Sequence, residues 1–188
     1  MKLIFGALLL LLLAACYDQT RTGNKEDTGP SAPTIETKRN KDLGNAQQPF
    51  RFDDNFTISS SHHPYMVTGY FNPDNYLDTA ILVRHKQTGK DVLFIQHGET
   101  PNTYLLLNGK QVGANFPDYN WVSQFEVVKK GTKIWNNVID GEIVGEEQVP
   151  ENKKITLQTD AIFVHVDEAG GGGIIYYQNN KYVWVQQD

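Results

Sequence analysis

The sequence predicts a mainly β protein, in which a single compact antiparallel β domain, built as a sandwich or barrel-like sheet with irregular loops, follows a disordered tether. Beyond residue 50, apolar residues recur mostly with a period of two, which is typical of strands. No segment shows the apolar stripe of a helix of about ten residues or more. Nearly all aromatic residues also lie in 50–188, and they supply enough apolar surface for one core.

The first two predicted strands form a hairpin. Residues 78–84 are β-branched and apolar on both faces, as in a central strand that is covered on two sides. Residues 91–96 follow the turn 87–90, which contains a glycine. We therefore expect the two segments to pair with each other.

The Asn108-Gly109 pair predicts a second hairpin, between 104–107 and 110–112, because this dipeptide favours the tight turn that joins two strands. Further strands are expected from the same alternation at 121–128, 133–135, 141–144, 154–158, 161–166, 173–178 and 181–186. Asn179-Asn180 predicts a tight turn between the last two of them.

The composition excludes several classes of protein. The chain of 188 residues carries 17 Lys and Arg against 22 Asp and Glu, a net charge of −5, whereas a nucleic-acid-binding domain usually has a basic face. A single cysteine excludes an internal disulfide framework and a cysteine-rich zinc module. We therefore expect no nucleic-acid partner.

The first residues predict a signal peptide, residues 1–15. A short basic start precedes an apolar run that extends to Ala15. As a helix this run would be about 20 Å long, too short for a hydrocarbon core of roughly 30 Å, so it has the length of a signal-peptide core instead. The run ends Leu13-Ala14-Ala15-Cys16, which resembles the lipobox of bacterial lipoproteins.

This resemblance implies that Cys16 is acylated after cleavage and anchors the chain to a lipid bilayer of the cell envelope. Two or three acyl chains hold a protein stably on a membrane, since each buried CH₂ contributes about 0.8 kcal/mol. By analogy with enteric lipoproteins, Tyr17 in place of an aspartate favours the outer membrane. Acylation would consume the only thiol, which excludes a catalytic cysteine.

Residues 16–49 predict a lipidated N-terminus and a disordered tether. Ile35 and Leu43 are the only large aliphatic residues of this segment, in which polar residues, Gly and Pro dominate. Such a composition cannot bury enough apolar surface to offset the cost of ordering. The mainly β globular domain is expected to occupy 50–188.

One motif points to metal chemistry. The segment from Gly69 to Leu82 resembles the aspartate loop of FG-GAP and VCBS repeats, in which a loop between two strands binds Ca²⁺. The resemblance implies ligands from the side chains of Asn72, Asp74 and Asp78 and from the carbonyl of Tyr76, because Ca²⁺ prefers oxygen ligands. More loosely, the whole domain resembles small lipoproteins that carry one such loop and have no agreed activity.

The motif departs from the family pattern at its first ligand. Tyr70 stands where the family has an aspartate, so two carboxylates are left for the cation. In the alternative interpretation, residues 72–75 form a β-turn whose polar side chains hydrogen-bond the loop backbone without a metal.

A glycine-rich segment precedes the last predicted hairpin. Its residues are Gly170, Gly171, Gly172 and Gly173, followed in the next strand by Tyr176 and Tyr177. Glycines permit a wide range of backbone conformations. Two interpretations are open. The segment could be a loop that inserts into a partner's cleft, in the way that protruding loops act in some periplasmic lysozyme inhibitors, or a mobile connection between strands.

The remaining polar residues favour no catalytic site. The histidines are His62, His63, His85, His97 and His165. They lack the spacing of a helical metal site, and we interpret them as surface or half-buried residues. No serine lies in a nucleophile motif. Neighbouring carboxylates, such as Asp53-Asp54, would face apart on a strand.

These observations predict a lipoprotein of the cell envelope that is not an enzyme. We expect a non-catalytic module that binds another envelope protein as an inhibitor, an immunity protein or a scaffold, with no cofactor other than Ca²⁺. Two alternatives remain: a calcium-dependent hydrolase that acts on glycan, which would need two facing carboxylates, and a structural subunit of an outer-membrane assembly.

Overall fold

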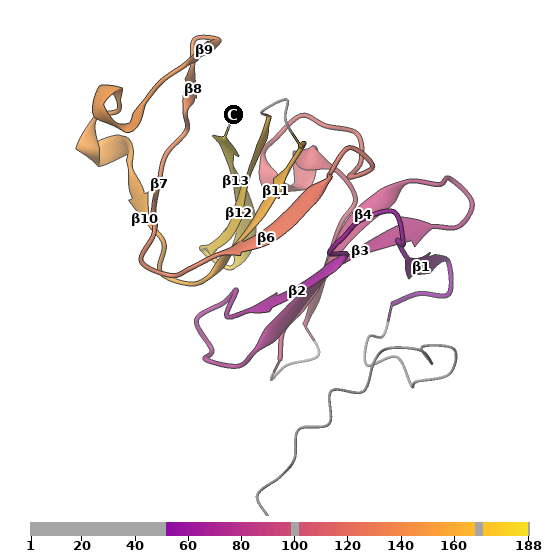
Figure 1. The fold of residues 1–188 in the computed structure, drawn as a ribbon. Coiled ribbons are helices and arrows are strands. Elements are labelled where there is room, and N and C mark those ends of the chain that lie inside the picture. The colour runs from indigo at the N-terminus through magenta and orange to yellow at the C-terminus, as the bar shows by residue number, and fades with distance from the viewer. Residues whose placement is uncertain (1–51, 99–101, 168–170, 188) are drawn as a thin grey trace, which may run out of the picture. The chain divides into compact units, whose positions relative to one another are not determined.

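Antiparallel strands make up most of the protein, and the predicted mainly β fold class is confirmed (Figure 1). The computed structural model describes residues 52–98, 102–167 and 171–187. These residues belong to one unit, 47–188. The predicted signal peptide 1–15 and the predicted lipidated tether 16–49, including Cys16, lie outside the described residues.

A five-stranded sheet is built around the long strand β3 (Asp78–His85). On one side it pairs with β4 (Asp91–Gln96), which in turn pairs with β5 (Thr103–Leu106). On the other side its two halves pair with β1 (Phe56–Ile58) and β2 (Met66–Gly69). The predicted β3–β4 hairpin is therefore confirmed.

A four-stranded sheet has the order β13-β12-β11-β6. Its strands are β6 (Gln124–Val128), β11 (Ala161–His165), β12 (Gly172–Gln178) and β13 (Lys181–Gln187). Asn179 and Asn180 join β12 to β13 with φ of 52° and 63°, the left-handed conformation that a tight hairpin turn requires and that asparagine tolerates. This turn was predicted from the sequence.

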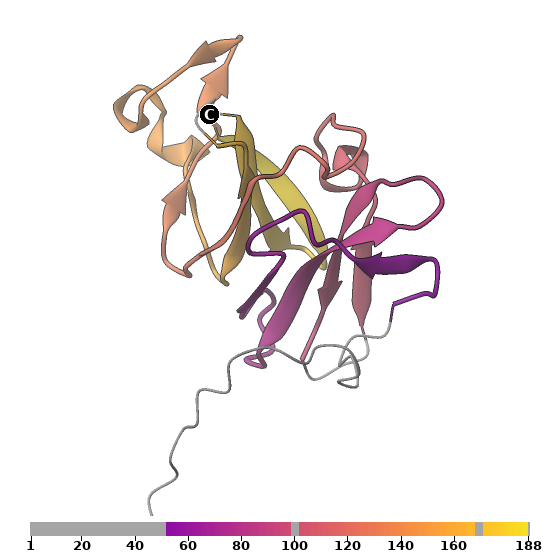
Figure 2. The ribbon, with the colours of Figure 1, turned by 45° about the vertical axis from the view of Figure 1, so that its right-hand side comes forward.

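Residues 133–156 form a separate extension, which we call the arm. At its base β7 (Lys133–Ile134) pairs with β10 (Ile155–Thr156). Beyond the base lie the hairpin of β8 (Val138–Ile139) and β9 (Glu142–Ile143) and two 3-10 turns, η2 (Glu146–Gln148) and η3 (Glu151–Lys153). Figures 1 and 2 show this hairpin projecting beyond the strands of the two larger sheets.

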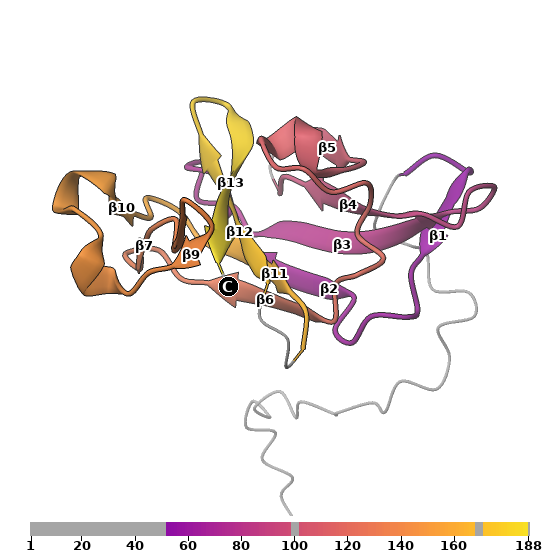
Figure 3. The ribbon, with the colours of Figure 1, turned by 90° about the horizontal axis from the view of Figure 1, so that it is seen from above.

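The two larger sheets pack on a shared core, which buries one face of each. It includes Ala80, Leu82, Leu93 and Ile95 from the first sheet and Phe125, Ile162, Val164 and Ile175 from the second. Figures 1 and 3 show the sheets next to each other, with β2 beside β6. Both sheets stay open over the described strands, so of the two predicted arrangements the fold has that of a sandwich.

Each larger sheet also has apolar side chains on its other face. Ile81 and Val83 of β3 pack there with Phe94 and Phe56, so β3 is covered on both sides, as its sequence predicts. On the second sheet, residues of β12 and β13 pack against Leu157 and against the base of the arm.

The second predicted hairpin, between 104–107 and 110–112, is wrong. Gly109–Val112 form a 3-10 turn, η1, because Asn108 acts as its cap. The side chain of Asn108 accepts a hydrogen bond from the amide of Lys110 at 3.1 Å, and that of Gln111 accepts one from the amide of Asn108 at 3.3 Å. This capping box satisfies the amides that a strand partner would otherwise have bonded.

Candidate functional site

The segment predicted to bind calcium is a loop between β2 and β3. Asp78, the first residue of β3, hydrogen-bonds the backbone of this loop. Asp78 is completely buried. Its Oδ2 accepts hydrogen bonds from the amides of Phe71 at 2.7 Å and Asn72 at 3.2 Å, and its Oδ1 accepts one from the amide of Gly98 at 2.9 Å. Burial raises the pKa of Asp78, although the hydrogen bonds from the amides of Gly98 and Phe71 oppose the shift.

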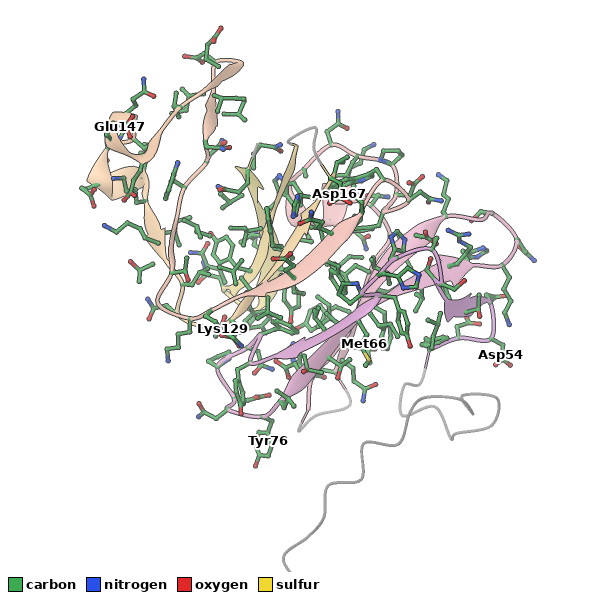
Figure 4. All side chains as sticks on the ribbon, in the orientation of Figure 1. Asp54, Met66, Tyr76, Lys129, Glu147 and Asp167 are labelled. Carbon is green, nitrogen blue, oxygen red and sulfur yellow. The ribbon has the colours of Figure 1, made fainter. Side chains whose placement is uncertain are left out.

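The other residues of the predicted ligand set close the loop among themselves. Oδ1 of Asn72 accepts from the amide of Asp74 at 2.9 Å, while its amide group donates to Oδ2 of Asp74 at 2.8 Å. Oδ1 of Asp74 accepts from the amide of Tyr76 at 2.8 Å. Figure 4 shows the Tyr76 side chain pointing away from the sheets.

These hydrogen bonds show how many oxygens of the loop are available to a cation. All four side-chain oxygens of Asp74 and Asp78 accept hydrogen bonds from protein donors, and the amide group of Asn72 donates toward Asp74 where a cation would need an acceptor. Among the described residues, no three of His, Cys, Asp or Glu are grouped as a metal site would need. The arrangement favours the metal-free β-turn, and calcium binding by the loop stays a prediction.

Beside this loop lies a cavity of about 390 Å³, which we call the Tyr70 cavity. It is bounded by Tyr70, Asn72 and Asn75 of the β2–β3 loop, by Lys130 after β6, and by Gln158 and Asp160 before β11. Its volume falls in the range of small-molecule sites, roughly 300–1,000 Å³. The cavity therefore forms where segments from both larger sheets meet.

Asp160 ties the segments around the cavity together. It is 4% exposed and accepts hydrogen bonds from the amides of Tyr70 at 3.2 Å and Lys130 at 2.9 Å and from Nζ of Lys129 at 3.1 Å. In return its own amide donates to the carbonyl of Tyr70 at 2.9 Å. Burial would raise the pKa of Asp160, but these donors outweigh it and hold the pKa below its ordinary value.

The glycine-rich segment differs from the predicted loop. Gly170 lies outside the described residues, and Gly171 has a φ of 90° just before β12. Gly172 and Gly173, however, are strand residues of β12. A Cβ atom on Gly173 would lie 2.3 Å from the ring of Trp184, and one on Gly172 would lie 2.3 Å from Cβ of His165. These two glycines permit close packing of strands rather than a mobile loop.

The two tyrosines predicted to contact a partner belong to the packed part of β12. Tyr176 is 8% exposed. Tyr177 is half-buried, and its hydroxyl lies 3.3 Å from that of Tyr104; burial, with this hydrogen bond, raises its pKa to about 12. Their place in the core follows from the paired strands β12 and β13, and it leaves little of Tyr176 for a partner.

His97 joins the two sheets within this tyrosine cluster. It is 3% exposed, and its Nε2 lies 2.9 Å from the hydroxyl of Tyr182 on β13. The rings of Tyr104 and Tyr177 also pack on it, with centroids 5.0 and 5.6 Å away. Burial lowers the pKa of His97.

A second buried histidine takes part in an ion network. His62, also 3% exposed, lies 2.7 Å from the carbonyl of Val122 through Nδ1 and 2.7 Å from Asp91 through Nε2. Asp91 is fully buried and accepts two hydrogen bonds of 2.7 Å from Arg84. Both His62 and His97 are buried, so the interpretation of these two as surface or half-buried residues is wrong. Their burial is possible because each has polar partners far away in sequence.

Comparison of the chain with protein-family models, curated proteins and solved structures finds no match. In the part of the chain that the structure describes, no helix has the length and apolar character needed to cross a membrane.

Proposed function

We propose that the protein is a lipid-anchored binding module of the bacterial cell envelope, and that it engages another envelope protein through the tip of the arm. The observation that carries this proposal is the exposure of large apolar side chains on a projecting hairpin. Contacts, charge and the N-terminal sequence each support it.

The base of the arm is firmly attached to the second sheet. Ile134 of β7 is 3% exposed and Leu157, just after β10, is 2% exposed, and both belong to the apolar cluster on the outer face of that sheet. Further out, Nζ of Lys154 lies 2.6 Å from Glu151 and 3.4 Å from Glu146. These contacts hold the base of the arm on the sheet, from which the tip projects.

The tip itself exposes apolar surface. Ile143 is 68% exposed and Ile139 is 41% exposed, on neighbouring strands joined at Asp140-Gly141. Ile143 pairs across the hairpin with Val138, which is half-buried. Burial of apolar surface against a partner gains about 25 cal/mol per Å², and a short two-stranded hairpin of this kind is only marginally stable without such contacts.

The charges around the tip indicate what kind of partner fits. Asp140, Glu142 and Glu147 are exposed, and none of them forms an ion pair with another described residue. Figure 4 shows Glu147 on the arm, far from the labelled Lys129. We therefore propose a partner protein that has an apolar contact area surrounded by basic residues, since complementary charges direct association.

The N-terminal sequence supports the location. The lipobox-like residues 13–16 predict an acylated Cys16, and residues 17–49 would extend about 30 Å as a flexible coil. Such a tether would let the arm approach a partner near the same membrane. On this proposal the protein lies in the outer membrane, as the residue after Cys16 favours.

The catalytic alternative has less support. A glycan hydrolase needs two facing carboxylates, one of which is free to exchange protons. Among the residues that line the Tyr70 cavity, the carboxylate is that of Asp160, which accepts from two amides and a lysine. Asp78 does not line the cavity, and it is fully buried and accepts from three backbone amides. These contacts support a binding role for the domain.

Site-specific crosslinking tests the proposal. A photoactivatable amino acid is placed at position 143 of the full chain in cells, and at position 107 as the control, because Leu107 is also exposed, at 43%, but lies outside the arm. We expect one protein adduct from position 143 and no such adduct from position 107. Equal adducts from both positions, or none from position 143, would contradict the proposal.

Charge reversal provides a second readout on the same partner. Glu142→Lys should weaken the complex of the full chain with the crosslinked protein, mostly through slower association, because a charge at the rim of an interface acts on encounter. Raising the salt concentration should weaken the unmodified complex in the same way. An affinity that changes with neither would exclude a basic partner surface. A structural subunit would instead copurify with a membrane complex at fixed stoichiometry.

A further inference from the structure

We propose that the Tyr70 cavity is a second binding site, which holds a sugar unit of a glycan against the ring of Tyr70 and hydrogen-bonds it through Asn75, Lys130 and Gln158. This site is distinct from the tip of the arm in both residues and chemistry. It does not depend on the partner proposed above.

The cavity is held in shape before any ligand binds. The carboxylate of Asp160 accepts hydrogen bonds from the amides of Tyr70 and Lys130, and the amide of Asp160 donates one to the carbonyl of Tyr70. The segments on the two sides of the cavity are therefore fixed to each other. On the loop side, the hydrogen bonds between Asn72 and Asp74 hold the turn. A preformed site pays little ordering cost on binding.

Tyr70 supplies the apolar wall of the site. Its side chain is 49% exposed, although its backbone is fixed on both sides by Asp160. Among the described aromatic residues, none packs its ring on that of Tyr70. An uncovered aromatic ring on a fixed backbone suits the flat C–H face of a pyranose, which is apolar while its edge is hydroxylated.

The polar groups of the cavity suit that hydroxylated edge. Asn75 and Gln158 carry side-chain amides, each of which can donate and accept hydrogen bonds. Gln158 uses one of its donors on the carbonyl of Thr156, which leaves its oxygen available. Lys130 forms no ion pair with any described residue. Hydroxyl groups, which both donate and accept, can use all three.

Other ligand classes fit this chemistry less well. A lipid or another apolar ligand would leave the amides and the lysine without partners, which is costly once water is excluded. A phosphate would find a single unpaired cation, Lys130, whereas phosphate sites usually combine several donors with a helix N-terminus or a glycine-rich nest. Asp160, already neutralised by Lys129, gives no counter-charge for a cationic ligand.

Binding to an oligosaccharide array tests the inference. The full chain is purified in detergent and applied to immobilised oligosaccharides of neutral hexoses, N-acetylhexosamines and uronic acids. We expect selective retention on at least one of these classes. Tyr70→Ala should weaken it about tenfold, which corresponds to the loss of one aromatic contact. Asn75→Gly, which keeps the left-handed backbone of φ 65°, should also weaken it.

Tyr76→Ala is the matched control, because Tyr76 lies on the same loop and is 48% exposed but does not line the cavity. It should bind as the unmodified chain does, and thermal unfolding should show that all three variants keep the fold. The inference is overturned if no oligosaccharide is retained, if Tyr70→Ala binds normally, or if Tyr76→Ala loses binding equally. Displacement of the sugar by unrelated peptides would assign the cavity to a protein ligand instead.

Discussion

At the scale of single residues, the buried polar groups are the side chains whose loss should lower the free energy of unfolding most. Asp91 has no exposed surface, and Arg84 and His62 both bond to it. Asp91→Asn would leave two donors without their anion. We expect it to lower the free energy of unfolding by about 1–3 kcal/mol, because buried His62 loses its charged acceptor whereas the half-exposed Arg84 can be hydrated. Urea unfolding measures the change.

The control for this variant is Asp54→Asn, since Asp54 is exposed and forms no ion pair with a described residue. It should change stability by less than about 0.5 kcal/mol. An Asp91→Asn protein as stable as this control would show that the network contributes nothing net to the fold.

The same network predicts how stability depends on pH. Burial would raise the pKa of Asp91, but the hydrogen bonds from Arg84 and His62 outweigh it and hold the pKa below its ordinary value. The carboxylate thus stabilises the folded state above the unfolded-state pKa of about 3.9, and this contribution is lost as the pH falls through the folded-state pKa. Acid unfolding of Asp91→Asn should therefore be less steep than that of the unmodified chain below about pH 4.

Removal of either of two buried tyrosine hydroxyls should change stability differently, depending on whether the hydroxyl has a hydrogen-bond partner. Tyr182 bonds to His97 at 2.9 Å, so Tyr182→Phe should cost about 1–2 kcal/mol. The hydroxyl of Tyr119 is buried and has no hydrogen-bond partner among the described residues, so Tyr119→Phe should be neutral or stabilising by about 1 kcal/mol. Thermal unfolding of both variants checks this, and an equal loss of stability in both would refute the distinction.

At the scale of elements, local sequence patterns predicted those strands whose apolar residues are flanked by clear turn signals. The bounds of β4 agree with the predicted 91–96, because its apolar residues are flanked by clear turn signals. The hairpin predicted at Asn108-Gly109 does not form, because Gln111 completes a capping box with Asn108. The capping box is as local as a hairpin turn, and the Asn-Gly dipeptide alone does not distinguish between them. Short strands such as β8 were missed, since two residues give no periodicity.

The candidate site was only partly visible in the sequence, for a physical reason. The motif located the loop that contains Asn72 and that Asp78 of β3 holds, because its hydrogen bonds connect residues close in sequence. The Tyr70 cavity is formed by three segments that only the folded sheets bring together, and Asp160 bonds to Tyr70 across 90 residues of chain. No spacing in the sequence reports such a contact.

The glycines of β12 give a test of their role as packing positions. Gly173→Ala would place Cβ 2.3 Å from the ring of Trp184 and 2.5 Å from the carbonyl of Val185. We expect a loss of about 1–3 kcal/mol, the usual cost of overpacking, measured by urea unfolding. Gly89→Ala is the comparison, because its turn has open space around Cβ although φ is 66°. A larger loss at Gly89 than at Gly173 would contradict the packing role.

At the scale of the whole molecule, the fold separates its two proposed contacts by the kind of surface each needs. The Tyr70 cavity depends on segments fixed by buried hydrogen bonds, which a shared core between two sheets can supply. The tip of the arm needs exposure, and β8 and β9 lie outside both larger sheets. The turn after β6 contributes Lys130 to the cavity and leads into β7, so one short segment connects the two regions.

The proposed membrane attachment would place these contacts at the envelope, and it depends on acylation of Cys16. In cells fed a labelled fatty acid, the unmodified chain should incorporate label and sediment with the membranes, because two or more acyl chains hold a protein stably on a bilayer. Cys16→Ala should incorporate none and leave the membrane fraction once the apolar leader is removed. Tyr17→Ala, one residue further on, should keep both label and membrane attachment. A native chain whose intact mass shows a free thiol would contradict acylation, and the arm would then have to find the proposed partner without the concentrating effect of a shared membrane.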